Sequence, residues 1–207
     1  MILCKSQKSN INDYFKLLTI NTMTLQNPTI DIVLIIKQLV EEFYKMDWDF
    51  NDFLTEDDVR CLLFSKLKTD LINYSTVSIH AEVRWYGTNS ENNKILKYRS
   101  DIVLIDKTDL ELNNNILPLP TKGYGFNKYY AIIEIKLRRP NDNHSDKSYN
   151  KIIQNDINKL KEIKNRTKRY SAINNRKYLM LAFDKKRNKK LFLDIDLNDS
   201  IVWNDWL

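Results

Sequence analysis

Hydrophobic residues recur along the chain with two different periods, and the changes of period predict the order of its elements. Residues 29–46, a segment that begins at Thr55, and residues 147–165 have apolar side chains three or four positions apart, as amphipathic helices do. Five short segments rich in β-branched and aromatic residues predict strands, over residues 77–87, 98–106, 128–137, 176–184 and 189–196. The last predicted helix separates the third and fourth strands. The pattern therefore favours an α/β fold with a mixed β-sheet flanked by helices.

The chain divides into few parts. With 207 residues it can form one substantial core, and we expect a single domain over residues 29–207. Residues 1–28 are polar and weakly periodic, which predicts a loosely held N-terminal arm. Residues 107–128 contain two prolines, two glycines and three consecutive asparagines, so we expect a long loop or insertion there.

Charge and cysteine content narrow the classes of function. The chain has 33 Lys and Arg against 27 Asp and Glu, and this net charge of +6 favours polyanionic partners such as nucleic acid. Cys4 and Cys61 are the only cysteines and form no C-x-x-C pair, which excludes zinc and iron–sulfur sites built on cysteine. This cysteine usage favours a reducing, intracellular (cytoplasmic) setting. The longest apolar run, residues 32–36, is too short to cross a bilayer, so we expect no membrane segment.

Two opposite charges interrupt the apolar strand predicted over residues 128–137. Glu134 and Lys136 are two positions apart and therefore point to the same face of that strand. Asp101 stands at the start of "IVLI" in the neighbouring predicted strand. Two carboxylates can hold a hard divalent cation such as Mg²⁺, and a lysine beside them can stabilise a water or a developing negative charge. This combination suits phosphodiester hydrolysis.

A plainer interpretation exists for the same residues. Glu134 and Lys136 can form the solvated face of an amphipathic strand and neutralise each other, and the pattern D…E-x-K is loose. The order of helices and strands around the three residues favours the site over the solvated face.

The segments "SDIVLI" and "AIIEIK" resemble the signature of the PD-(D/E)XK nuclease superfamily, and the resemblance spans about residues 52–184. It implies a restriction-endonuclease-like three-layer core that hydrolyses nucleic acid, usually DNA. Asp101, Glu134 and the backbone carbonyl of Ile135 would hold Mg²⁺, with Mn²⁺ as a substitute, and Lys136 would orient the attacking water. Ser100 stands where the family usually has proline, and the gap of 33 residues from Asp101 to Glu134 is long.

The family also commonly has a glutamate on the helix that precedes the strands. Three acids are available after Thr55, a good N-cap with Asp58 three positions on. At about 100° per residue, Glu56 falls within the apolar stripe, whereas Asp57 points roughly opposite. The stripe consists of Val59, Leu62, Leu63 and Leu67. Glu56 is therefore the candidate fourth acid, and the alternative is a first-turn acid that only favours the helix dipole.

Other polar residues have weaker claims. Glu82 could lie beside the metal or form an ion pair with Arg84 or Arg99, and the ion pair is the favoured interpretation. His80 is interpreted as a packed strand residue rather than a ligand. On the last predicted helix, Gln154 stands where some related nucleases have a site residue, but it is interpreted as a surface residue, and Asp156 as an anchor that forms an ion pair. Basic residues that could contact phosphates, or could simply be solvated, gather in residues 136–139, 161–170 and 184–190.

The sequence thus predicts an Mg²⁺-dependent deoxyribonuclease, an endonuclease in the first instance, with Asp101, Glu134, Lys136 and Glu56 at its site. Two alternatives stay open: a DNA-binding or assembly module that keeps the nuclease fold without cleaving, and an unrelated α/β domain. The form of the nucleic acid, the sequence specificity and the formation of a homodimer are not fixed by these residues.

Overall fold

The fold was analysed in a computed structural model of the chain. The structure describes residues 28–49, 51–85, 98–111, 125–126, 129–167, 175–197 and 200–206. The N-terminal arm predicted over residues 1–28 lies outside this set, apart from Pro28. Among the described residues, no helix is long and apolar enough to cross a membrane.

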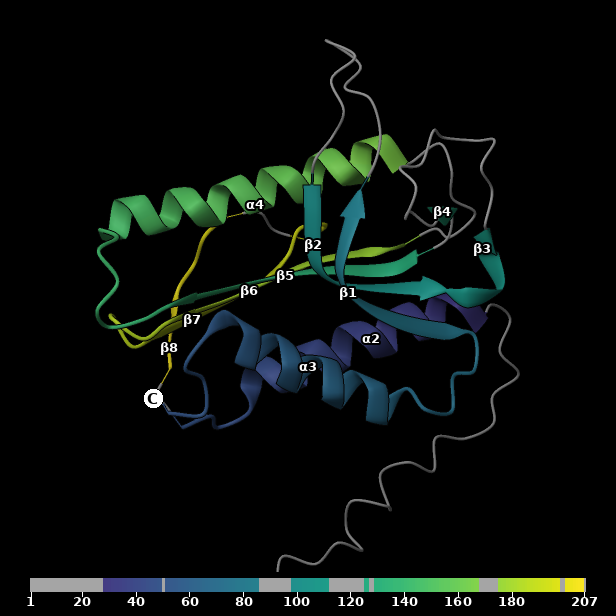
Figure 1. The fold of residues 1–207 in the computed structure, drawn as a ribbon, viewed down its shortest axis with the longest axis horizontal. Helices are drawn as coiled ribbons and strands as arrows, with labels where there is room; N and C mark the ends of the chain where they lie inside the picture. Colours follow the sequence, from purple (N-terminus) through teal and green to yellow (C-terminus); the bar gives the residue numbers. More distant parts are fainter. Residues whose placement is uncertain are drawn as a thin grey trace, which may run out of the picture.

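A six-stranded sheet runs through the molecule (Figure 1). Its strands follow in the order β1 (Val77–Trp85), β2 (Tyr98–Asp106), β5 (Tyr129–Arg138), β6 (Lys177–Asp184), β7 (Lys189–Asp194) and β8 (Asn204–Asp205). Strands β5 and β6 are parallel and all other neighbours are antiparallel, so the sheet is mixed. The parallel pair is joined by the crossover helix α4 (Asp146–Thr167), as such a connection requires.

Helices cover both faces of this sheet. Figure 1 shows α2 (Pro28–Lys45) and α3 (Glu56–Asp70) on one side and α4 on the other. The apolar stripes of α2 and α3 bury residues against one sheet face: Val33, Ile36, Val40, Phe43, Val59, Leu63, Leu67, Ile102, Leu104, Ile133, Ile135, Leu179, Leu181 and Phe183. The stripe of α4 buries a second set: Tyr149, Ile153, Ile157, Leu160, Ile163, Val103, Ile105, Ile132, Tyr178, Met180 and Ala182. The α/β fold with a mixed sheet between helices is therefore confirmed.

Several boundaries differ from the prediction. The strand predicted over residues 189–196 ends at Asp194, and the two-residue strand β8 was not predicted because so short a segment has no measurable period. Residues 107–128 are not wholly loop. They contain a 3₁₀ turn (Lys107–Asp109) and the paired strands β3 (Leu110–Glu111) and β4 (Gly125–Phe126), while residues 112–124 lie outside the described set.

The start of α3 is fixed by packing and by a cap. Phe53 is fully buried and its ring lies 5.1 Å from those of Trp48 and Phe183. Two residues later, the Thr55 hydroxyl accepts from the Asp58 amide at 3.2 Å, and the Asp58 carboxylate accepts from the Thr55 amide at 2.7 Å. This reciprocal capping box places Glu56 in the first turn of the helix.

One residue of the predicted α3 stripe does not belong there. Leu62 is 39% exposed, whereas Val59, Leu63 and Leu67 are fully buried. The buried stripe is narrower than the sequence indicated, because α3 contacts the sheet along one row of side chains.

Candidate functional site

The sheet opens at one level between β2 and β5. Their antiparallel pairing includes Ile102 with Ile133, and one step further along both strands come Asp101 and Glu134. There the backbone partner of Ile135 is replaced by a side chain, because Asp101 Oδ2 accepts from the Ile135 amide at 2.7 Å. The Asp101 carboxylate is thereby fixed beside Glu134 at the mouth of a fork between the strands.

Glu134 lies on the face of β5 that α4 covers. Its neighbours Ile133 and Ile135 belong to the core under α2 and α3, and strand alternation sends Glu134 the other way. Its side chain is buried, and its Oε2 accepts from Lys159 Nζ at 2.6 Å. Its Oε1 is also buried and has no hydrogen-bond partner among the described residues.

This environment changes the acidity of Glu134. Burial raises the pKa of its carboxyl to about 8, Lys159 opposes that rise, and the negative charge of Asp101 adds to it. The unpartnered oxygen and the raised pKa both indicate that the positive charge around Glu134 does not fully stabilise its ionised form.

Lys136 points to the same face and reaches three oxygens. Its ammonium lies 2.8 Å from the backbone carbonyl of Ile135, 3.0 Å from Glu56 Oε1 and 3.4 Å from Asp156 Oδ2. Burial lowers the pKa of Lys136, but Asp156, Glu56 and Asp101 outweigh burial, so the net shift is upward. Lys136 is therefore protonated at neutral pH.

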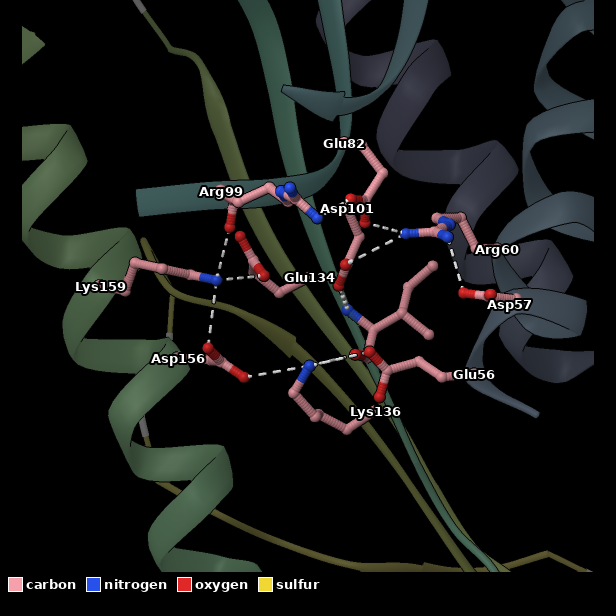
Figure 2. Close-up of polar contacts among 11 residues, drawn as sticks. Glu56, Asp57, Arg60, Glu82, Arg99, Asp101, Glu134, Lys136, Asp156 and Lys159 are labelled. Atoms are coloured by element: carbon pink, nitrogen blue, oxygen red, sulfur yellow. Dashed lines mark hydrogen bonds and ion pairs between the residues drawn. The ribbon is translucent and has the colours of Figure 1, made fainter. Parts of the chain in front are cut away.

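Glu56 comes to the site from the first turn of α3 (Figure 2). Burial raises the pKa of Glu56, and the ammonium of Lys136 works against that rise. Asp57, which was predicted to point away, forms an ion pair with Arg60 at 2.6 Å instead. The structure thus brings Asp101, Glu134, Lys136 and Glu56 together in one cluster.

Arg60 lies on the exposed side of this cluster. It forms ion pairs with Glu82 and, at 3.9 Å, with Asp101 Oδ1. Glu82 also pairs with Arg99, as the sequence suggested.

The backbone of Glu82 is unusual. Glu82 has φ 58°, a left-handed conformation that costs a non-glycine residue about 1–2 kcal/mol. Its two neighbours on β1 pair with β2, Ala81 with Ile102 and Val83 with Ser100. Glu82 therefore stands opposite Asp101. The distorted backbone of β1 and the opened fork of β2 and β5 lie at the same level of the sheet.

The cluster as a whole carries an excess of acid. Among the residues drawn in Figure 2 its carboxylates are Glu56, Asp57, Glu82, Asp101, Glu134 and Asp156, and its cations are Arg60, Arg99, Lys136 and Lys159. Carboxyl groups therefore outnumber cations among these side chains.

Sequence reasoning missed Lys159. It is three positions after Asp156 on α4 and forms an ion pair with it at 3.1 Å. Asp156 was predicted to anchor the helix through an ion pair, and that prediction is confirmed. The i, i+3 spacing of an acid and a base inside an apolar stripe was the signal that could have found Lys159.

The minor candidates behave as expected. Gln154 donates to Asn158 on the surface of α4, and His80 is half-buried beside Ser78, where burial lowers the pKa of the imidazole. The side chain of Arg84 lies outside the described set.

Arg138 neither faces solvent nor is free to contact a phosphate, the two alternatives that the sequence left open for residues 136–139. Its side chain is fully buried, forms two hydrogen bonds with Asp184 at 2.8 and 2.6 Å and another with Asp146 at 2.8 Å. On β5 it shares the face of Glu134 and Lys136, so alternation turns it inward. Lys185 is also buried and donates to the carbonyl of Phe53 at 2.8 Å. Arg139, by contrast, is 60% exposed.

The donor set bears on metal binding. No group of three or more His, Cys, Asp or Glu side chains within the described residues is arranged to hold a metal ion. Asp101 and Glu134 supply two carboxylates, and the backbone carbonyl of Ile135 a further oxygen. All are hard oxygen donors of the kind that Mg²⁺ accepts, and Mg²⁺ usually keeps several waters and takes only one or two carboxylates. The buried, unpartnered Glu134 Oε1 fits such an ion.

Comparison of the chain with protein-family models, with curated proteins and with solved structures gave no match.

Proposed function

We propose that the protein is a divalent-metal-dependent nuclease of the PD-(D/E)XK type, with a restriction-endonuclease-like fold, that hydrolyses phosphodiester bonds in DNA as an endonuclease. The observation that carries this proposal is the fork between β2 and β5. It sets Asp101 beside a buried Glu134 that has one unpartnered oxygen, with Lys136 on the same strand face.

Three oxygen donors at the fork are the proposed metal ligands. Asp101, Glu134 and the backbone carbonyl of Ile135 would hold Mg²⁺ or Mn²⁺. When bound, the ion would supply a water of lowered pKa and stabilise negative charge on the phosphate.

Lys136 has the properties required of the residue that orients the attacking water. Its pKa is raised, so it carries a positive charge and three donors at neutral pH. Glu56 Oε1 accepts a hydrogen bond from the Lys136 ammonium at 3.0 Å and so holds the ammonium at the fork. A cation fixed in advance stabilises developing negative charge without reorganisation at the moment of reaction.

The basic surface supports a polyanionic substrate. Arg99 is 49% exposed beside the cluster, and Arg139 is 60% exposed at the end of β5. Together with the net charge of +6, these residues favour a phosphate backbone as the partner.

A binding or assembly module that keeps the fold without cleaving is the second candidate. The observation that favours it is the pairing of Glu134 with Lys159, because an internal cation already neutralises the carboxylate that the metal would need. Only the nuclease requires Asp101 and Lys136 for turnover.

Plasmid cleavage in Mg²⁺ separates the two candidates. We expect the wild type to cleave the plasmid and the Asp101→Asn and Lys136→Met variants not to cleave it. The Lys151→Met control, whose lysine is exposed on α4, should cleave like the wild type. Circular dichroism should show that all four proteins are folded. If the wild type binds DNA without cleaving it, the binding or assembly module is favoured. Full Mg²⁺-dependent cleavage by either site variant would contradict the site assignment.

A further inference from the structure

The ammonium of Lys159 is held as a metal ion would be held. Its three donors meet three oxygens: Glu134 Oε2 at 2.6 Å, the backbone carbonyl of Arg99 at 2.9 Å and Asp156 Oδ1 at 3.1 Å. A carboxylate from β5, a backbone carbonyl from β2 and a carboxylate from α4 therefore surround one ammonium group, which is largely buried. The start of β2 turns toward α4, which brings Arg99 within reach of Lys159 (Figure 1).

Asp156 links this lysine to Lys136. One of its carboxylate oxygens contacts Lys159 and the other lies 3.4 Å from Lys136, so a single acid on α4 fixes both ammonium groups (Figure 2). If Lys159 left Glu134, it would keep Asp156 as a partner. The structure therefore provides a place for the lysine to remain after displacement.

We propose that Lys159 is an internal counter-cation of the metal site: it pairs with Glu134 in the metal-free protein, a divalent ion must displace it, and Asp156 then retains it beside Lys136. This inference rests on the proposed function in that it takes Asp101 and Glu134 as the metal ligands. It assigns Lys159 and Asp156 as positioning residues that set the affinity for the ion.

The sign of the effect follows from charge. A divalent ion at Glu134 carries two positive charges and is repelled by Lys159 twice as strongly as a single positive charge would be. Removal of the lysine charge therefore favours binding of the ion. A proton on Glu134 carries only one positive charge, so it gains less than the ion does when the lysine charge is removed. The uncharged variants should bind Mg²⁺ more tightly than the wild type.

Calorimetric titration with MgCl₂ at one ionic strength and near-neutral pH tests this inference. We expect Lys159→Met to bind Mg²⁺ about tenfold more tightly than the wild type, a change of about 1.4 kcal/mol. Lys159→Gln should do the same, and its amide keeps a donor for Glu134 if the methionine variant does not fold. Lys151→Met, on the exposed side of the same helix, should match the wild type. The added substitution Asp101→Asn should abolish the gain.

Three results would overturn the inference. They are equal or weaker Mg²⁺ binding by both uncharged variants, a gain that persists with Asp101→Asn, and no binding by any of the proteins. The plasmid-cleavage assay with Asp101→Asn does not involve Lys159, so it decides the proposed function separately.

Discussion

Two clusters of charged side chains lie on the same face of β5, one around Arg138 and one around Glu134. Arg138 is fully buried, and its guanidinium meets Asp184 in a two-bond pair, Asp146 in a third bond and the ring of Tyr149 at 5.0 Å. Asp184 also accepts from the amides of the turn that follows β6. The polar atoms of this pair are satisfied, so the cluster is a structural link between β5, β6 and the start of α4.

The Glu134 cluster differs in being incomplete. Glu134 Oε1 is buried without a hydrogen-bond partner among the described residues, and the carboxylates of the cluster outnumber its cations. Buried polar atoms normally find partners, and an unsatisfied one costs about 1–3 kcal/mol. The difference between the clusters teaches that burial of charge alone does not indicate a site. A buried carboxylate oxygen that is left without a partner does.

The largest expected effect is on stability at the complete cluster. Arg138→Met leaves the buried Asp184 without its cation and should lower the free energy of unfolding by about 3 kcal/mol or more. The next residue gives a matched control, because Arg139 is exposed and its pair with Asp142 is worth about 0–1 kcal/mol. Urea denaturation measures both variants, and equal losses would erase the distinction between a buried and a surface pair.

Metal should stabilise only the incomplete cluster. At an Mg²⁺ concentration about 100 times the dissociation constant, the free energy of unfolding of the wild type should rise by about 2.7 kcal/mol. Arg138→Met should show the same rise, because its cluster lacks metal ligands, and Asp101→Asn should show none. Thermal denaturation with Mg²⁺ and with chelator provides the measurement. A rise of equal size in Asp101→Asn would place the ion outside the fork.

The raised pKa of Glu134 predicts a pH dependence. Its folded pKa of about 8 exceeds the ordinary carboxyl value, so the folded protein binds the proton more tightly than the unfolded chain does. That contribution is fully present below the unfolded pKa and is lost as the pH rises through about 8. Without metal, as the pH rises from the unfolded pKa of the carboxyl to about 8, the free energy of unfolding of the wild type should fall by up to about 1.4 kcal/mol per pH unit relative to Glu134→Gln. Parallel pH profiles of the two proteins would contradict the assignment.

The smallest effect concerns the cap that places Glu56. Thr55→Ala removes the hydroxyl that caps α3 and should cost about 1 kcal/mol. Thr69→Ala, at the exposed end of the same helix, should change stability by about 0.5 kcal/mol or less. Denaturation of the two variants measures the difference. If Thr55→Ala lowers the free energy of unfolding by no more than Thr69→Ala does, the packing of Phe53 alone fixes the start of the helix.

The sequence predicted most of the fold because its signals were local. Strand alternation placed Glu134 and Lys136 on one face, and helical phase aimed Glu56 at the sheet. The adjacency of Asp101 and Glu134 depends on strand order and register, which periodicity does not determine and the resemblance only implied. Lys159 and Arg138 were missed or misread because their roles depend on partners far away in the sequence. These partners are Glu134 on β5 and Asp184 on β6.

The central claim is that a divalent cation completes the Glu134 cluster, and a crystal structure of the protein soaked in Mn²⁺ tests it most directly. The account predicts an anomalous peak between Asp101, Glu134 and the backbone carbonyl of Ile135, with the Lys159 ammonium withdrawn from Glu134 and still held by Asp156. A map with no peak at the fork and Lys159 still bound to Glu134 would contradict it.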